Sequence, residues 1–210
     1  MNKKIGLMTA LGVLGLVGFA SLAAATQFNF TVSATVPAAT GVSVTVSSVN
    51  SSTNAFTTLP SGTTALSFDP MTFNTTNGIY LPNHYYALDF GATGGAGTPS
   101  LSLTYTEGTN PNGTSDGLGT KTTATFAKEV VGTGGSTTET ILPEGKMRLI
   151  DLQGTTVPAS QVAGGFARVY LGVWTGSTTA PADPSNGKPF SNADAAGTYT
   201  GSLVITGTVA

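Results

Sequence analysis

Residues 197–210 read Gly-Thr-Tyr-Thr-Gly-Ser-Leu-Val-Ile-Thr-Gly-Thr-Val-Ala. In this segment apolar side chains alternate with hydroxyl side chains over most of the length. Because successive side chains of a β-strand point to opposite faces, the spacing predicts one long strand with a single apolar face. That face consists of Tyr199, Leu203, Ile205 and Val209, with Gly197, Gly201 and Gly207 in the same alternation.

A second segment, residues 26–36, alternates in the same way and reads Thr-Gln-Phe-Asn-Phe-Thr-Val-Ser-Ala-Thr-Val. It carries no charge, and Pro37 and Gly41 end it. The spacing predicts an extended strand or arm over residues 26–40. Its apolar face consists of Phe28, Phe30, Val32, Ala34 and Val36.

Between these segments the apolar spacing is again two, and no stretch sustains a 3.6-residue period. Residues 47–64 and 110–119 are expected to be loops, and residues 65–73 to form two short strands or one bulged edge strand around Asp69-Pro70. About eight to ten short strands joined by Gly-rich turns predict an all-β, antiparallel β-sandwich over residues 41–210. Further strands are expected near 42–46, 79–90, 101–105, 120–131, 147–151 and 166–174.

Composition excludes several classes of protein. The 210 residues include 28 glycines and no cysteine, only 9% are charged, and the formal net charge is −2. Nucleic-acid binding needs clustered Lys and Arg, so it is not expected. Without cysteine there is no disulfide, no thiolate chemistry and no Cys-ligated metal. A hydroxyl-rich, weakly charged surface is typical of extracellular proteins that pack against copies of themselves.

Residues 1–25 have the pattern of a secretory signal peptide. Lys3 and Lys4 precede an apolar run from Ile5 to Leu22, and Ala23-Ala24-Ala25 forms a small-residue cleavage site. The alternative is an uncleaved membrane anchor, because the run is close to the length that spans a bilayer. The sequence therefore predicts a secreted protein of the cell surface.

The C-terminal segment resembles the last strand of chaperone–usher pilus subunits and their spore-coat-U-like relatives. In those proteins a Gly-x-Tyr motif begins fourteen residues from the end, as Gly197 and Tyr199 do here, and the penultimate residue is hydrophobic, as Val209 is. This chain departs from the family in having no aromatic penultimate residue and no disulfide.

The resemblance implies an immunoglobulin-like sandwich with a hydrophobic groove that is filled by the N-terminal arm of the next subunit. It also implies copies of the same chain as partners, together with a periplasmic chaperone and an outer-membrane usher. Residues 26–36 would be the donor strand, and four of their large apolar side chains would contribute about 6–12 kcal/mol on burial. The alternative is that the segment is the first strand of its own sandwich.

The residues offer little for catalysis. His84 is the only histidine, and no Gly-x-Ser-x-Gly accompanies it. The loop at residues 110–117 carries oxygen ligands but misses the calcium-binding spacing, so no metal or other cofactor is expected. Four glutamates, taken as solvated charges near turns or at exposed strand positions, do not predict a glycosidase: Glu107, Glu129, Glu139 and Glu144. The chain is therefore not expected to be an enzyme.

A binding module is the second functional hypothesis. Four aromatic side chains, Tyr80, Tyr85, Tyr86 and Trp174, could form a surface for a sugar ring. The chain would then be a monomeric secreted adhesin or glycan-binding sandwich that recognises a host or glycan surface.

The leader generates the first testable prediction. Mass spectrometry of extracellular protein should show an N-terminus at or within a few residues of Thr26. A retained Met1 in surface material would identify residues 1–25 as an anchor and would contradict cleavage.

Overall fold

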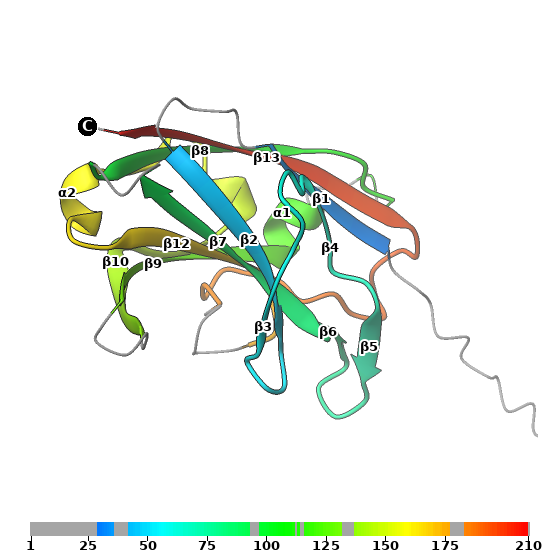
Figure 1. Ribbon diagram of the computed structural model, residues 1–210. Coiled ribbons are helices and arrows are strands. Elements are labelled where there is room, and N and C mark those ends of the chain that lie inside the picture. Colours follow the sequence, from blue (N-terminus) through cyan, green and yellow to red (C-terminus); the bar gives the residue numbers. More distant parts are fainter. Residues whose placement is uncertain are drawn as a thin grey trace, which may run out of the picture.

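The computed structural model describes residues 29–35, 42–92, 97–111, 113, 116–131, 137–176 and 183–209. It is an all-β sandwich, as the alternating sequence predicts, in which two sheets pack face to face (Figure 1). The leader at residues 1–25 and the donor-strand candidates Phe28 and Val36 lie outside the described residues.

The first sheet contains both segments that decided the fold. Its strand order is β11 (Thr155–Val157), β8 (Pro99–Glu107), β13 (Thr198–Val209), β1 (Asn29–Thr35) and β4 (Ala65–Ser67). The pairing of β1 with β13 is parallel, while the other pairs in this sheet are antiparallel.

The second sheet is antiparallel throughout. Its order is β10 (Thr137–Arg148), β9 (Thr122–Val131), β12 (Phe166–Val173), β7 (His84–Ala92), β2 (Val42–Asn50) and β3 (Phe56–Thr58). A separate hairpin of β5 (Met71–Asn74) and β6 (Ile79–Pro82) extends from one end of the sandwich (Figure 1).

The main core lies between the two sheets. In β8 and β13 every second side chain is buried, which is the burial pattern that period-two spacing produces. The second sheet is also covered on part of its outer face, because a smaller cluster of buried residues lies there: Val49, Tyr85, Ala87, Ala127 and Tyr170.

Among the described residues, three single turns of helix interrupt the strands: α1 (Leu118–Lys121), the 3-10 turn η3 (Leu149–Asp151) and α2 (Ala159–Val162). Such turns are too short to produce a period in the sequence. The start of α1 is fixed by Glu107, whose carboxylate accepts the backbone N–H groups of Leu118 and Gly119, both at 2.9 Å. No helix among the described residues has the length and hydropathy needed to cross a membrane.

Several strand boundaries differ from those expected. Residues 65–73 form two short strands, β4 and the start of β5, with a cis peptide bond at Asp69-Pro70 between them. The strand expected at 147–151 instead ends at Arg148 and begins at Thr137, because a bulge between Ile141 and Lys146 hides its alternation. The short strand β3 lies where a loop was expected, and β11 lies where no strand was expected.

The core position of β13 gives a stability prediction. Ile205 is fully buried, whereas its neighbour Val204 is only partly buried. Ile205→Ala should lower the free energy of unfolding by about 2–5 kcal/mol, because it leaves a cavity between the sheets. Urea denaturation of Ile205→Ala and Val204→Ala measures the difference. Equal losses in the two variants would show that both faces of the strand are packed.

Candidate functional site

The position of β1 within the first sheet is the candidate functional site. β1 lies between β13 and β4 and pairs with both, seven residues with β13 and three with β4. We call the position between Thr198–Val204 and Ala65–Ser67 the β1 slot. Neighbouring strands are about 4.8 Å apart, so β13 and β4 are separated by roughly 10 Å across the slot.

The register places the apolar positions of β1 beside core positions of its neighbours. Phe30 pairs with Tyr199 and Ala34 with Leu203, and both of these β13 side chains are fully buried. On the other side Val32 pairs with Leu66, which is also fully buried. The slot therefore has an apolar inner side, as the alternation of residues 26–36 requires.

The groove residues expected from the sequence fall into two groups. Tyr199 lies beside Phe30 and Leu203 beside Ala34, so these two residues border the slot, whereas Gly197 directly precedes β13. Ile205 and Val209 lie beyond Val204, the last residue of β13 that pairs with β1. Ile205 belongs to the core, while Val209 is partly buried opposite Pro99 of β8.

Gly201 is required at the centre of the slot. A Cβ at this position would lie 2.1 Å from the hydroxyl oxygen of Tyr105. The Tyr105 hydroxyl donates to Oε1 of Glu107 at 3.2 Å, and burial, followed by the nearby Glu107 carboxylate, raises the pKa of Tyr105. Because Gly201 has no side chain, the neutral Tyr105 ring can lie against the backbone of β13 at this point. Gly201 is also the residue of β13 that pairs with Val32 of β1.

The four aromatic residues considered for ligand binding do not gather into one surface. Tyr80 and Tyr86 belong to the main core, whereas Tyr85 lies in the outer cluster of the second sheet. Trp174 donates its Nε1–H to the Pro184 carbonyl at 3.2 Å, and a Cβ at Gly187 would lie 2.1 Å from its ring.

His84 is a packed residue, and its ring contacts β4, one of the two strands that border the slot. Its Nε2 lies 2.8 Å from the carbonyl oxygen of Ser67 in β4, and its Nδ1 lies 2.5 Å from Oδ1 of Asn83. In the described part of the chain, no three His, Asp or Glu side chains come together in a group that could hold a metal ion.

A buried ionic cluster on the outer face of the second sheet was not predicted from the sequence. Arg168 of β12 donates to Asp89 at 2.6 and 2.9 Å and to Glu129 at 2.9 Å. Tyr170 donates to Glu139 at 2.5 Å. The expectation that Glu129 is a solvated charge is wrong: Glu129 is 1% exposed, because Arg168 pairs with it on the covered part of this face.

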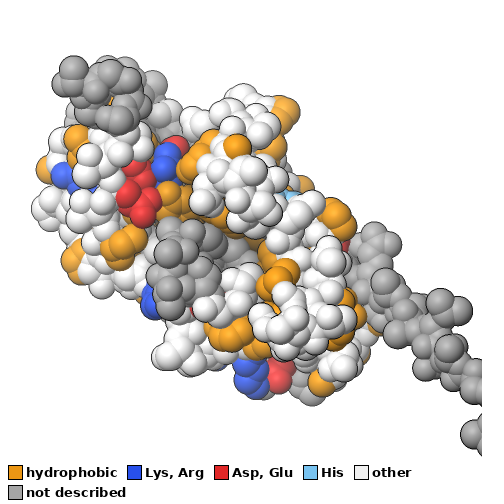
Figure 2. Space-filling view, turned by 90° about the horizontal axis from the view of Figure 1, so that it is seen from below, with side chains coloured by type: hydrophobic (Ala, Val, Ile, Leu, Met, Phe, Trp, Pro, Cys, Tyr) orange, Lys and Arg blue, Asp and Glu red, His pale blue; other side chains and the backbone are white. Residues whose placement is uncertain are grey.

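Charged side chains are otherwise sparse on this side of the molecule. Figure 2 shows a surface of mainly uncharged polar and backbone atoms with acidic and basic side chains in small groups. The sequence signal for the cluster is the pair of glutamates Glu129 and Glu139, which the register of β9 and β10 places directly opposite each other.

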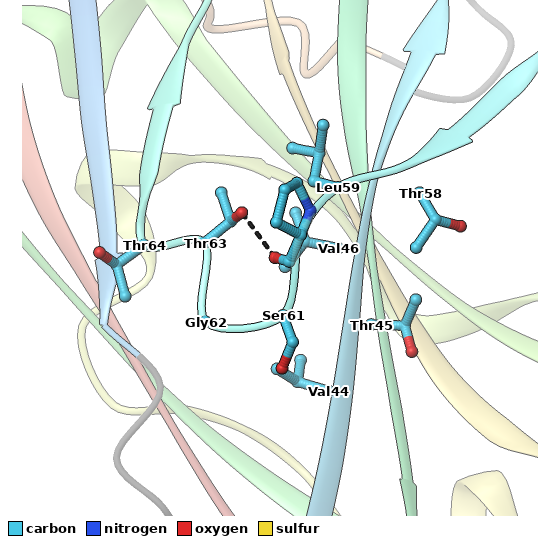
Figure 3. Close-up of a pocket in the computed structure, with 10 residues that line it drawn as sticks. Val44, Thr45, Val46, Thr58, Leu59, Ser61, Gly62, Thr63 and Thr64 are labelled. Atoms are coloured by element: carbon cyan, nitrogen blue, oxygen red, sulfur yellow. Dashed lines mark hydrogen bonds between the residues drawn. The ribbon is translucent and has the colours of Figure 1, made fainter.

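A pocket of about 310 Å³ lies between β2 and the chain segment that leads from β3 to β4. Its lining comes from residues 44–46 and 58–64 and contains no charged side chain. The hydroxyl of Thr63 donates to the Pro60 carbonyl at 2.7 Å and closes the turn (Figure 3). The pocket therefore offers no acid, base or nucleophile activated by a base.

In comparisons with known proteins, no family model, no curated protein and no solved structure matches the chain. The site is therefore interpreted from its own geometry.

The ionic cluster predicts a dependence of stability on pH. Burial, followed by a hydrogen bond with Glu139, raises the pKa of Glu129 above its usual value, and the opposing effect of Arg168 is smaller. A carboxyl whose pKa is higher in the folded state stabilises the fold at low pH, and this contribution is lost as the pH rises from about 4.5 through the folded-state pKa.

Glu129→Gln removes this titration while keeping an oxygen that can accept from Arg168. Thermal unfolding between pH 4 and pH 8 should therefore show a smaller loss of stability with rising pH in Glu129→Gln than in the wild type. Glu144→Gln, which changes a carboxyl of the edge strand β10 bonded to Gln161 rather than to Arg168, is the comparison variant. Parallel profiles for all three proteins would contradict the buried-carboxyl assignment.

Proposed function

We propose that this chain is a structural subunit of an extracellular fibre, in which the β1 segment of one copy fills the β1 slot of the next. The observation that carries the proposal is the place of β1: a strand near the N-terminus that occupies an interior position of its sheet and pairs on both edges. The resemblance of residues 197–210 to the last strand of pilus subunits supports the same function.

The covalent connection of β1 supports exchange. After Thr35 the chain continues only through residues 36–41 to β2, which belongs to the other sheet. Six residues reach at most about 20 Å, and the two sheets of a sandwich are about 10 Å apart. The connection is therefore longer than the distance between the sheets, which leaves length for β1 to enter a neighbouring chain. Exchanging such a terminal element between identical chains recreates the same contacts, so it is a low-cost route to association.

The slot also has the chemistry of a strand-addition site. None of the residues of β1, of β4 or of β13 between Thr198 and Val204 is charged. Association would depend on backbone hydrogen bonds and apolar burial, which is the usual basis of β-augmentation. The incoming strand would run parallel to β13 and antiparallel to β4, in the register that β1 adopts in its own chain.

The proposal places the chain outside the cell, with copies of itself as partners. A periplasmic chaperone and an outer-membrane usher would be further partners if assembly follows the family that the C-terminal strand resembles. The role is structural rather than enzymatic, because the contacts of His84, with Ser67, Tyr86 and Asn83, belong to a packed residue.

A self-contained binding module is the second candidate function. It is favoured by one observation: in the single chain, β1 lies in its own sheet. The dispersal of Tyr80, Tyr85, Tyr86 and Trp174 between the core and separate surfaces gives this candidate no ready glycan site.

Cysteine pairing can distinguish the two candidates, because the natural chain has no cysteine. Ser33 of β1 lies opposite Ala65 of β4. A pair of cysteines at such opposed positions has the Cα separation that a disulfide needs. Ser33→Cys and Ala65→Cys are made as two separate single variants, beginning at Thr26. We expect co-refolding at high concentration, followed by oxidation, to give covalent dimers of one variant with the other.

The control mixes Ser33→Cys with Thr57→Cys, an exposed position on β3 at the edge of the other sheet, which should not cross-link. Unmodified protein should form oligomers that resist SDS and run as a ladder on gels, and heating should dissociate these oligomers. Monomers alone, in the cross-linking mixture and in the gels, would eliminate the fibre proposal and leave the self-contained module.

A further inference from the structure

β4 is the weaker wall of the β1 slot. It has three residues, lies at the end of the first sheet and has β1 as its strand neighbour in that sheet. When β1 is absent, β4 therefore loses its sheet pairing. A three-residue segment without a strand partner would not keep its place by backbone pairing alone.

The backbone of Ser67, the last residue of β4, is held by side chains of the second sheet. Its N–H donates to the hydroxyl oxygen of Tyr86 at 3.1 Å, and its carbonyl accepts from the same hydroxyl at 2.6 Å. Nε2 of His84 lies 2.8 Å from that carbonyl and 3.1 Å from the Tyr86 hydroxyl. Tyr86 and His84 both belong to β7, so β7 is tied directly to β4.

These bonds do not depend on β1. Alternate residues of a strand direct their backbone groups to opposite edges. Because the Ser67 N–H is used by Tyr86, Ser67 directs its groups to the outer edge, and Leu66 directs its groups toward Val32 of β1. The contact with Tyr86 thus remains available when the slot is empty, and it also occupies the edge at which a further strand could add.

The position of the Tyr86 ring is itself fixed. The side chain is buried in the main core, and the ring of Phe68 packs edge-on against it with 5.4 Å between centroids. Burial raises the pKa of Tyr86, so its hydroxyl keeps the proton that it donates to Ser67. Leu66 and Phe68, on either side of Ser67, are fully buried and anchor the same segment in the core.

We propose that Tyr86, assisted by His84, is a positioning residue that keeps β4 in place as a fixed wall of the empty β1 slot, ready for the arm of a second copy. This role rests on the proposed function. It explains how a short edge segment can take part in strand exchange without collapsing into the slot: the wall is attached to the opposite sheet rather than to the departing strand.

The test uses Tyr86→Phe, which removes the hydroxyl and keeps the ring. Tyr85→Phe is the matched control, because it is the adjacent residue, its side chain lies in the other cluster, and its hydroxyl donates to Asn54 at 3.2 Å. Amide hydrogen exchange in the full mature chain should accelerate at Ser67 by roughly three- to tenfold in Tyr86→Phe, the loss expected for one hydrogen bond. The amide of Val169 in β12 should keep its rate, and Tyr85→Phe should leave both rates unchanged.

A second measurement follows strand exchange itself. Introducing Tyr86→Phe into the Ala65→Cys chain should slow the formation of covalent dimers with the Ser33→Cys chain, and Tyr85→Phe should not. Dimers that form at the wild-type rate, or exchange that accelerates equally at Ser67 and Val169, would overturn the positioning role alone. Absence of dimers in the otherwise unmodified pair would overturn the fibre proposal and the role of Tyr86 in exchange together.

Discussion

The first sheet depends on the insertion of one strand between two others. β1 connects β13 to β4, and without it the sheet ends at β13 and leaves the apolar side chains of Tyr199, Leu203 and Leu66 beside an open gap. Unpaired strand edges and exposed apolar surface favour association with another chain. The slot must therefore be filled by this chain's own strand or, in the proposed assembly, by a neighbour's, and the same contacts would then serve both folding and assembly.

The second sheet needs no such completion, and it supplies fixed points for the first. Its central strands β9, β12 and β7 are each paired on both sides, and their buried residues fill both the main core and part of the outer face. From this sheet Tyr86 and His84 reach across to Ser67. In the proposed assembly, the first sheet would exchange a strand while the second sheet preserves the structure.

The sequence predicted the fold well where alternation is strong and poorly where other contacts determine the structure. The periods of two in residues 26–36 and 197–210 placed β1 and β13, but they carried no information on whether the two strands run parallel. The break in β10 and the three-residue strands β3 and β11 escaped prediction because a bulge or a short length leaves no period to read.

The sequence analysis named the apolar positions of the candidate site, but it did not predict the polar contacts around that site. The alternation grouped Phe30, Val32 and Ala34 on one face but did not specify their register partners in β13, and the proposed role of Tyr86 depends on a backbone contact 19 residues away that no local pattern encodes. Burial of Glu129 was missed for the same reason, since it requires Arg168, which is 39 residues distant in sequence.

The donation of β1 to a neighbouring copy would have a consequence for the ends of an assembly. A strand that leaves one copy and enters the next by the same rule gives a head-to-tail interface, and such interfaces produce open filaments with two different ends. One end would present a vacant slot and the other a free arm. The copy with the vacant slot would already have donated its arm to its neighbour, so that slot would stay open to the arm of an incoming copy. A chain whose arm fills its own slot would have neither a vacant slot nor a free arm, and it could not join the filament.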